Sequence, residues 1–423
     1  MYNALQGLVG RGRAQDLGRA QDGKHDAVAA RRLRVLEPGY TLATVRTAAT
    51  TVGLTLTTGD DWELFWSYRP PWDNETLKRR LQHTTLGLAR DPPRLVVNHV
   101  PGTLPLASKA HLPTFVRAAG LSAVLPESYL LPEDSAALEH RLATAGVNDG
   151  RGWPRWLFKA KNHRGVRVLT DGSAGALAKN SPAIVQQLVK PLLLRRLRRA
   201  FDIGLYVLIS SVHPLRVYAY DRALVRFCER EYPTAPDGYA HDLRSYVISH
   251  YTPIWTLPIF AESLRKCNDS AACALRAELN AEGHDADKLW RRMRSTAGRL
   301  LTALQPHMAS AMASRGLGNE STFELFRFDF MVNEAAEPVL TEVNISPNLV
   351  PASTQDGKVK RALVHDVLQI VRQRFEHTTS AMDPARRAAG QPAQTKRREG
   401  RVGVAEALVA AQGGFQLVRT GNR

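Results

Sequence analysis

Two neighbouring segments late in the chain alternate between apolar and polar residues, and this pattern constrains the fold more than any other feature. Residues 323–332 read FELFRFDFMV, so three phenylalanines fall on one face of a predicted strand. Arg327 and Asp329 fall on the opposite face, because successive side chains of a strand point to opposite sides. The segment therefore predicts a strand that carries an acid opposite an aromatic face.

The second segment, residues 338–345, alternates in the same way and places Glu342 and Asn344 on one face. The polar residues 333–337 between the two segments are few enough for a hairpin. Pairing about the middle of that turn would put Asp329 opposite Thr341 or Glu342. The predicted hairpin thus gathers two carboxylates and an amide oxygen on one surface.

These gathered oxygen atoms, from Asp329, Glu342 and Asn344, suit a hard cation. No thiolate or imidazole lies nearby in the sequence, so the predicted ion is Mg²⁺, held by a few protein oxygens with phosphates supplying the rest. Alternation alone leaves a second interpretation open, in which the acids form the solvated edge of an exposed hairpin.

Length and composition narrow the class of protein. With 423 residues, 44% of them hydrophobic, the chain can bury a large core and is expected to form two or three lobes. Its three cysteines are too few for a disulfide framework and lack zinc-site spacing, so a reducing, cytoplasmic compartment is expected. No apolar run approaches the roughly 20 residues of a membrane helix, so we expect a soluble protein that does not enter a membrane.

The net charge of +17 predicts a polyanionic partner, which could be nucleic acid, an acidic membrane or an acidic protein surface. The sequence has no zinc-finger, RNP or basic-zipper pattern, so nucleic acid is not the expected partner. A merely solvated basic surface is the alternative.

Changes in composition divide the chain. The two ends are polar and rich in Ala and Arg, which predicts disorder, whereas the interior alternates between strand-like and helix-like patterns. The predicted segments are a disordered basic segment (1–35), an N-terminal α/β lobe (36–147), a central lobe (153–195), a C-terminal lobe with the metal site (196–376) and a disordered basic tail (377–423).

Within the C-terminal lobe, residues 201–228 read as core strands. Residues 287–313 have helical periodicity that we expect Pro306 to interrupt. A further helix is predicted over residues 362–375.

The central lobe contains a strand that ends at Lys159, a basic loop and a returning strand, which together suit a lid over phosphates. The lysine supplies a point charge, and the loop residues Arg164 and Gly165 let backbone donors approach closely. An exposed hairpin with solvated cations is the alternative. The following strand, residues 183–189, carries Gln186 and would form a hinge between lobes.

Several of these motifs resemble the tubulin tyrosine ligase-like family over roughly residues 37–375. FELFRFDFMV and TEVNISPN are similar to its metal-binding strands, and FDIGLYVLISSVHPLRVY is similar to a long core motif. WELFWS, NHVPG and PESYLLP follow in the family's order. The resemblance implies an ATP-grasp fold with an N-terminal lobe and two lobes that sandwich ATP.

The resemblance also implies roles for single residues. Lys159 and the loop with Arg164 and Gly165 would contact the phosphates of ATP, and Gln186 would hold the edge of adenine. Lys360 would hold the carboxylate of an incoming amino acid. Coordination of the magnesium ions of ATP is implied for Asp329, Glu342 and Asn344.

The chain departs from the family at three positions: a lysine is replaced by Ala200, an arginine by Gly204 and a loop glycine by Arg167. The arginine helps to hold the reacting groups in the family. We hypothesise that Arg327, which lies on the predicted metal face, takes its role, because a guanidinium suits a carboxylate or a phosphate.

The implied activity is an ATP-dependent ligase that adds glutamate to glutamate side chains of tubulin tails through an acyl phosphate. The expected protein is a monomer in the cytoplasm, on the microtubule cytoskeleton or in a cilium. Two alternatives stay open: a catalytically impaired relative that binds ATP or microtubules, and a ligase that uses glycine, tyrosine or another protein substrate.

Overall fold

Strand β9, Phe201–Ser211, is the centre of the largest sheet, and all of its residues are buried. Along one side it pairs with β13, and along the other it pairs first with β11 and then with β10. This sheet has seven strands: β9, β10 (Arg216–Tyr220), β11 (Leu224–Cys228), β12 (Tyr251–Pro253), β13 (Glu324–Val332), β14 (Pro338–Asn344) and β15 (Phe415–Leu417).

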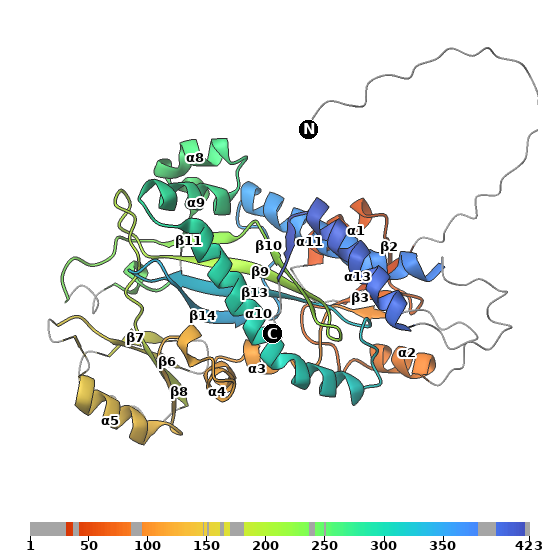
Figure 1. The fold of residues 1–423 in the computed structure, drawn as a ribbon, viewed down its shortest axis with the longest axis horizontal. Helices are drawn as coiled ribbons and strands as arrows, with labels where there is room; N and C mark the ends of the chain where they lie inside the picture. The colour runs from red at the N-terminus through yellow and green to blue at the C-terminus, as the bar shows by residue number, and fades with distance from the viewer. Residues whose placement is uncertain are drawn as a thin grey trace, which may run out of the picture. The chain divides into compact units, whose positions relative to one another are not determined.

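The structure is a computed structural model with a mixed helix and strand fold (Figure 1). It describes residues 31–36, 42–85, 95–146, 148–149, 152–160, 165–169, 182–236, 242–248, 251–379 and 395–418, with backbone alone in helical residues 82–85, 376–379 and 395–402. All of them belong to one unit, Arg31–Arg423. The predicted disorder of residues 1–30 lies outside the described residues, whereas residues 32–35 form a strand.

Two smaller sheets accompany the large one. The first is parallel, in the order β2-β1-β3-β4, and the second is antiparallel, in the order β5-β8-β6-β7. Their strands are β1 (Arg32–Val35), β2 (Thr55–Thr57), β3 (Leu64–Trp66), β4 (Val96–Val97), β5 (Ser128–Leu131), β6 (Trp156–Ala160), β7 (Val166–Val168) and β8 (Ala183–Gln187).

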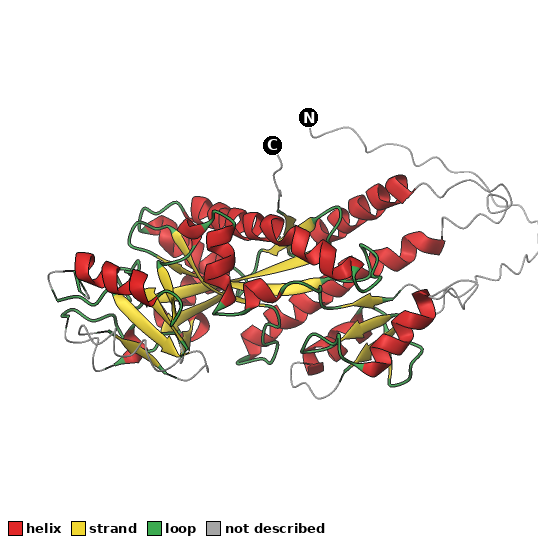
Figure 2. Ribbon diagram, turned by 90° about the horizontal axis from the view of Figure 1, so that it is seen from below, coloured by secondary structure: helices red, strands yellow, loops and turns green. Residues whose placement is uncertain are grey.

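Helices pack on both faces of the large sheet. One core joins α10 to the three alternating phenylalanines of β13, and a second core joins α1 and α11 to the opposite face, as Figure 2 shows with helices above and below the long strands. The α-helices are α1 (Leu42–Thr51), α2 (Glu75–Thr85), α3 (Leu104–Ala107), α4 (His111–Ala118), α5 (Ser135–Ala145), α8 (Ala261–Lys266), α9 (Ala271–Ala281), α10 (Ala286–Ala313), α11 (Thr354–Thr379) and α13 (Thr395–Gln412). None of the described helices is long and apolar enough to cross a membrane.

The predicted hairpin is confirmed. Strands β13 and β14 pair antiparallel, with Asp329 opposite Glu342 and Arg327 opposite Asn344. The aromatic face packs in the core beneath α10, because alternation sends those side chains to the side away from Asp329. The sequence left the partner of Asp329 open between Thr341 and Glu342, and the structure selects Glu342.

Helix α10 corrects the prediction of an interruption at Pro306, since it continues without a break from Ala286 to Ala313. A proline removes one backbone hydrogen bond and crowds the preceding turn. Here Leu304 and Met308, on either side of it, are fully buried while Pro306 faces solvent. The packing of the apolar face therefore outweighs the local cost.

The prediction of a disordered tail is wrong for residues 395–418. Helix α13 packs beside α11, and β15 pairs antiparallel with β10. Composition misled the prediction, because the segment is polar overall but contributes Ala410 and Phe415 to a core. Its one acid near that core, Glu406, is fully buried against arginines.

The cysteines also differ from the expectation. Cys267, just after α8, and Cys273, in α9, form a disulfide, with Cα atoms 5.6 Å apart. The turn between the two helices brings these residues together, which spacing alone did not predict. Cys228 is a buried free cysteine.

Candidate active site

A cleft of about 320 Å³ lies against the large sheet, with β6 and β8 of the antiparallel sheet among its walls. The cationic side chains that line it come from separate parts of the chain: Lys109 follows α3, Lys159 lies on β6 and Arg226 lies on β11. The carboxylates of Asp329 and Glu342 line it as well. The fold therefore brings together groups that are up to 233 residues apart, from Lys109 to Glu342.

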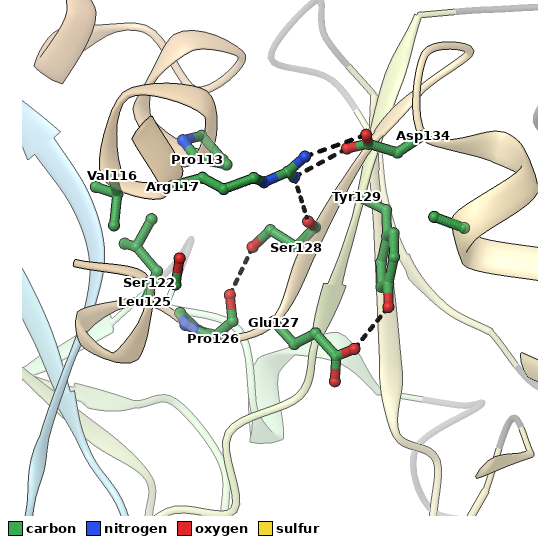
Figure 3. Close-up of a pocket in the computed structure, with 11 residues that line it drawn as sticks. Pro113, Val116, Arg117, Ser122, Leu125, Pro126, Glu127, Ser128, Tyr129 and Asp134 are labelled. Atoms are coloured by element: carbon green, nitrogen blue, oxygen red, sulfur yellow. Dashed lines mark hydrogen bonds and ion pairs between the residues drawn. The ribbon is translucent and has the colours of Figure 1, made fainter. Parts of the chain in front are cut away.

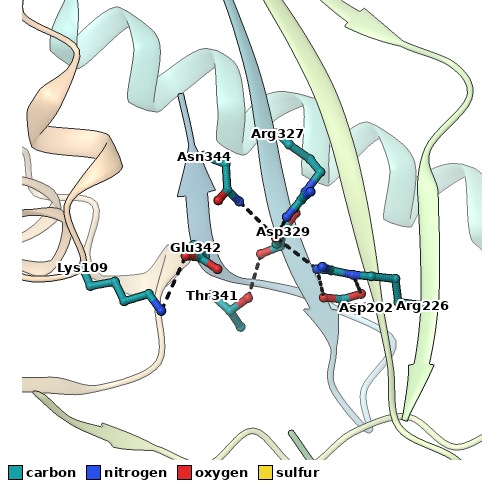
Figure 4. Close-up of polar contacts among 8 residues, drawn as sticks. All are labelled: Lys109, Asp202, Arg226, Arg327, Asp329, Thr341, Glu342 and Asn344. Atoms are coloured by element: carbon teal, nitrogen blue, oxygen red, sulfur yellow. Dashed lines mark hydrogen bonds and ion pairs between the residues drawn. The ribbon is translucent and has the colours of Figure 1, made fainter. Parts of the chain in front are cut away.

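Asp329 is the most heavily bonded carboxylate of the site (Figure 4). Arg327 donates to both of its oxygens, from Nε at 2.6 Å and from Nη2 at 2.7 Å. Arg226 Nη2 donates at 3.0 Å and Asn344 Nδ2 at 3.2 Å. Burial acts to raise the pKa of Asp329, but the charges of Arg327 and Arg226 and their hydrogen bonds hold it below its usual range.

Asp202 and Arg226 are site residues that the sequence interpretation missed. They lie opposite each other on β9 and β11, and Arg226 donates to both oxygens of Asp202, with Nε to Oδ1 at 2.9 Å. Burial is the main cause that raises the pKa of Asp202. The FDIG and VRF motifs contain both residues, but only the pairing of the strands shows that they meet.

Glu342 is the carboxylate that stays most accessible. Its side chain is 37% exposed, and Lys109 Nζ lies 3.6 Å away. Thr341, beside it, instead donates from its hydroxyl to the backbone oxygen of Asp329 at 2.9 Å. Glu342 therefore lines the cleft with a partly exposed carboxylate that pairs with Lys109.

The predicted metal ligands Asp329, Glu342 and Asn344 are adjacent on two paired strands, so the structure brings them together. The described residues contain no group of three or more His, Cys, Asp or Glu side chains arranged to hold a metal ion. Asp329 is bound by guanidinium groups, which compete with a cation. The donor set fits a metal ion only through Glu342, the amide oxygen of Asn344 and one oxygen of Asp329, with other ligands from outside the protein.

Lys159 is partly buried and donates to the side-chain oxygen of Gln186 at 2.6 Å. Gln186 in turn donates to the hydroxyl of Ser128 at 2.9 Å. Removal from water, together with the nearby charge of Lys109, lowers the pKa of Lys159 to about 8. The side chain of Gln186, which lines the cleft, thus accepts from Lys159 and donates to Ser128.

Gly165 immediately precedes β7 and has a φ of +100°, a conformation that strongly favours glycine. The residues between β6 and Gly165 lie outside the described part of the chain, so the predicted loop over phosphates stays a prediction. Arg167 stacks over the ring of Phe158 at 4.5 Å. Arg164 lies outside the described residues.

Lys360, the second predicted catalytic residue, is 4% exposed and does not line the cleft. Its Nζ donates to the backbone oxygen of Val350 at 2.7 Å and pairs with Asp356 at 2.8 Å. Burial is the main cause that lowers its pKa. In this conformation Lys360 fixes the segment before α11 and presents no donor to a ligand in the cleft.

A second pocket of about 240 Å³ lies between α4 and β5 (Figure 3). Its charged groups are paired, since Arg117 donates to Asp134 at 3.0 Å and Tyr129 donates to Glu127 at 2.6 Å. Such a pocket leaves no reactive group free, so the cleft described above is the candidate active site.

The cleft combines cations suited to an anionic ligand with carboxylates suited to a cation, on a mixed helix and strand fold. The sequence model of the tubulin-tyrosine ligase family matches residues 91–380. The chain belongs to this family, which confirms the resemblance found in its motifs.

Curated relatives agree with this assignment. The chain is 30% identical over 291 residues to the "Probable tubulin polyglutamylase ttll-15" of Caenorhabditis elegans, which covers 68% of this chain and 52% of that protein. It is 28% identical over 255 residues to the human "Tubulin monoglutamylase TTLL4", covering 58% of this chain and 20% of that protein. The chain thus spans about half of the first relative's length and a fifth of the second's.

Proposed function

We propose that this protein is an ATP-dependent ligase that adds glutamate to glutamate side chains of tubulin tails, on an ATP-grasp fold with two lobes around the nucleotide. Family membership supports ligase chemistry, and the names of the relatives support tubulin and glutamate. The observation that carries the proposal is the cleft itself, where three cations and three carboxylates meet.

The nucleotide phosphates would lie among Lys109, Lys159 and Arg226. These residues come from three different elements, so a ligand held by all of them would fix those elements relative to one another. Lys159 carries a proton at neutral pH, because its pKa of about 8 is still above 7. The site therefore offers charged donors to phosphate oxygens in a partly dehydrated cleft, where such bonds are stronger than in water.

Glu342, with Asn344 and one oxygen of Asp329, would hold Mg²⁺ on the side of the phosphates. When bound, Mg²⁺ would neutralise the charge that develops on the transferred phosphoryl group. Glu342 is suited to this role because its carboxylate lines the cleft and is partly exposed.

The protein's own residues would position the reactants without acting as a nucleophile. In the proposed reaction, a carboxylate of the acceptor attacks the terminal phosphate of ATP, and ADP leaves. The amine of the incoming glutamate then attacks the acyl phosphate, an amide bond forms, and phosphate leaves. Arg226 and Arg327 would hold the anionic groups that gather during these two steps.

The net charge of +17 suits an acidic polypeptide as substrate, because opposite charges raise the rate of encounter. The protein would act as a monomer on cytoplasmic microtubules or in a cilium. Two alternatives stay open: another amino acid, and a relative that binds ATP or microtubules without turnover. The second is favoured by one observation, the hydrogen bonding of Lys360 to its own segment.

The test is incorporation of labelled glutamate into purified tubulin by the full chain, with and without ATP and Mg²⁺. The proposal predicts incorporation that depends on both. Parallel reactions with labelled glycine and tyrosine identify the amino acid. If none of the three is incorporated while ATP still binds, the ligase proposal is wrong and the non-catalytic alternative is supported.

A further inference from the structure

The disulfide between Cys267 and Cys273 joins the end of α8 to the first turn of α9. Cys273 is exposed and Cys267 is half-buried, so a small thiol in solution can reach the bond. The two cysteines are only six residues apart, and a disulfide that closes a short loop stabilises the folded state less than one that closes a long loop. In the cytoplasm proposed above, protein disulfides are mostly transient or redox-sensing. This bond is therefore better suited to reversible chemistry than to permanent stabilisation.

The turn that the disulfide closes has an unusual backbone. Asn268 and Asp269 both lie in the left-handed region, with φ of +49° and +60°. Single asparagines and aspartates adopt this conformation, but two non-glycine residues in succession rarely do. The disulfide holds both ends of the turn, so its reduction removes a restraint from a strained backbone.

The same turn contacts the edge of the large sheet through Trp255. The indole Nε1 of Trp255 donates to the backbone oxygen of Asp269 at 2.9 Å. Trp255 lies two residues after β12, which has three residues and pairs with β11 at the edge of the sheet. So short a strand has few hydrogen bonds of its own, and its position therefore depends on what holds its ends.

Strand β12 in turn contacts the cleft. The guanidinium carbon of Arg226 lies 5.8 Å from the centre of the Tyr251 ring, and Tyr251 is the first residue of β12. Arg226 lines the cleft and donates to Asp202 and Asp329. Helix α9 also packs against β11, near the end of the sheet where α8 and α9 lie (Figure 1). A continuous series of contacts thus joins the disulfide to a cation of the cleft.

We propose that Cys267 and Cys273 form a redox switch that acts on Arg226 through Trp255 and β12. When the disulfide is formed, the turn holds Trp255 and thereby β12 against β11. When the disulfide is reduced, the turn releases Trp255, and the support of Arg226 by β12 weakens.

A small thiol such as glutathione supplies the electrons for this switch. Its thiolate attacks the exposed sulfur of Cys273, the sulfur–sulfur bond breaks, and the thiolate of Cys267 leaves and takes up a proton. A second thiol attacks the mixed disulfide and releases Cys273 as a thiol. The protein gains two electrons and two protons, and the two small thiols become one disulfide. This chemistry is independent of the proposed function, whereas its effect on nucleotide affinity rests on that function.

The first test follows the thiols. The full chain is equilibrated in buffers of reduced and oxidised glutathione, its thiols are trapped with iodoacetamide, and the modified cysteines are identified by mass spectrometry. Cys267 and Cys273 should be modified together, at thiol-to-disulfide ratios that cells span, and oxidised glutathione should reverse the change. The buried Cys228 should stay unmodified and serves as the internal control. A bond that stays formed in excess reduced glutathione, or that does not form again, would overturn the proposal.

The second test measures hydrogen exchange of residues 251–256 in the two redox states. Reduction should speed exchange there about tenfold, because the short strand opens more often, and should leave residues 216–220 of β10 unchanged. In Trp255→Phe, which lacks the indole donor, exchange should be fast in both states. If the exchange of residues 251–256 in the wild type does not depend on the redox state, the disulfide does not act on β12.

The third test measures the dissociation constant of a non-hydrolysable ATP analogue with Mg²⁺ by calorimetry, so that turnover is not needed. Reduction of the wild type should weaken binding about fivefold, a size typical of coupling between separate sites. Trp255→Phe should show a redox difference of less than about twofold. The matched control Trp72→Phe, at another half-buried tryptophan, should keep the wild-type response.

Equal affinities of the oxidised and reduced wild type would refute the action on Arg226. A wild type that binds no nucleotide in either state would refute the proposed nucleotide site instead, and hydrogen exchange would then decide the switch alone. A switch that operates in a chain unable to incorporate glutamate would refute the ligase proposal and leave this inference standing.

Discussion

Strand β9 carries two clusters of arginines and carboxylates, one near each end, and they differ in how completely their hydrogen bonds are satisfied. At the end near Ser210, Glu406 accepts from Ser210 at 2.7 Å, from Arg216 at 2.8 Å and from Arg374 at 3.3 Å. We call this the closed cluster. At the other end, Asp202 and Asp329 bind Arg226 and Arg327 beside the cleft, and we call these four residues the open cluster.

In the closed cluster, Arg374 has no capacity left for a ligand. Arg374 is fully buried and also donates to the backbone oxygens of Glu320, Thr322 and Ser210. Among the described residues, the open cluster leaves Nη1 of Arg327 without an acceptor, and Glu342 beside it is 37% exposed with one ion pair, to Lys109. The comparison teaches that arginines and carboxylates can serve two purposes. Where their hydrogen-bonding groups are all used within the protein, they stabilise the fold. Where some of these groups remain unused, they are available to a ligand.

The largest expected effect is on stability, from Glu406→Gln. The change leaves Arg374 and Arg216 with one buried carboxylate fewer, and breaking a buried ion pair costs about 3–5 kcal/mol. Urea unfolding should show this loss, whereas Val404→Ala on the exposed side of α13 should cost less than about 0.5 kcal/mol. A loss below about 1 kcal/mol for Glu406→Gln would mean that the closed cluster does not anchor the tail.

The next effect is on activity, from Glu342→Gln in the hairpin of the open cluster. Loss of the accessible carboxylate should reduce the rate of glutamate incorporation by about a hundredfold, as for removal of one preorganised electrostatic group. The free energy of unfolding should change by less than about 0.5 kcal/mol, because the side chain is partly exposed. A large loss of stability would show that Glu342 belongs with the structural residues.

A smaller effect concerns pH. It distinguishes Lys159, which can lose its proton, from the arginines of both clusters, which stay charged. Because the pKa of Lys159 falls to about 8 on folding, the lysine loses its proton as the pH rises past 8, and the KM for ATP should then increase about tenfold. Lys159→Arg should keep the KM flat, since arginine stays charged. A wild-type KM that is constant between pH 7 and about 9.5 would contradict this role.

The same pKa predicts the direction of a stability change. The unfolded lysine has the ordinary value of 10.5, so between pH 8 and 10.5 the unfolded state binds more protons. This group therefore contributes a rise in stability as the pH increases through that window. The difference between wild type and Lys159→Met in unfolding experiments at pH 7.5 and 10 checks the sign.

The smallest expected effect is that of salt. Raising the ionic strength screens exposed charges but hardly affects buried pairs. Incorporation at low tubulin concentration should therefore fall a few fold between about 0.05 and 0.3 M salt, while the midpoint of thermal unfolding stays nearly constant. A midpoint that falls in parallel with activity would indicate that salt acts on the fold.

The sequence predicted the part of the site that local alternation defines. The pairing of Asp329 with Glu342 followed from period and turn length, and the strands of the central lobe followed from the pattern around Lys159. Arg226 and Asp202 escaped notice because their meeting depends on β11 pairing with β9, which residue patterns do not reveal. Such pairings between strands that are far apart in the sequence decide which charged side chains form ion pairs.

The prediction of a disordered tail failed for a related reason, whereas the role of Lys360 stays a prediction. Composition describes average polarity, whereas the tail is held by a few buried residues, above all Glu406, whose arginine partners lie 32 and 190 residues away. For Lys360, a family role was carried over to a side chain that bonds Val350 and Asp356 in this chain. Sequence therefore indicated the residue types of the site better than their partners.

The measurement that tests the account most directly is glutamate incorporation into tubulin by wild type, Glu342→Gln and Glu334→Gln side by side. Glu334 lies exposed in the turn of the same hairpin, so its variant makes the same change of charge away from the cleft. The account predicts full activity for Glu334→Gln and about a hundredfold loss for Glu342→Gln, with all three equally stable. Equal activity of the two variants would contradict the assignment of the cleft as the active site.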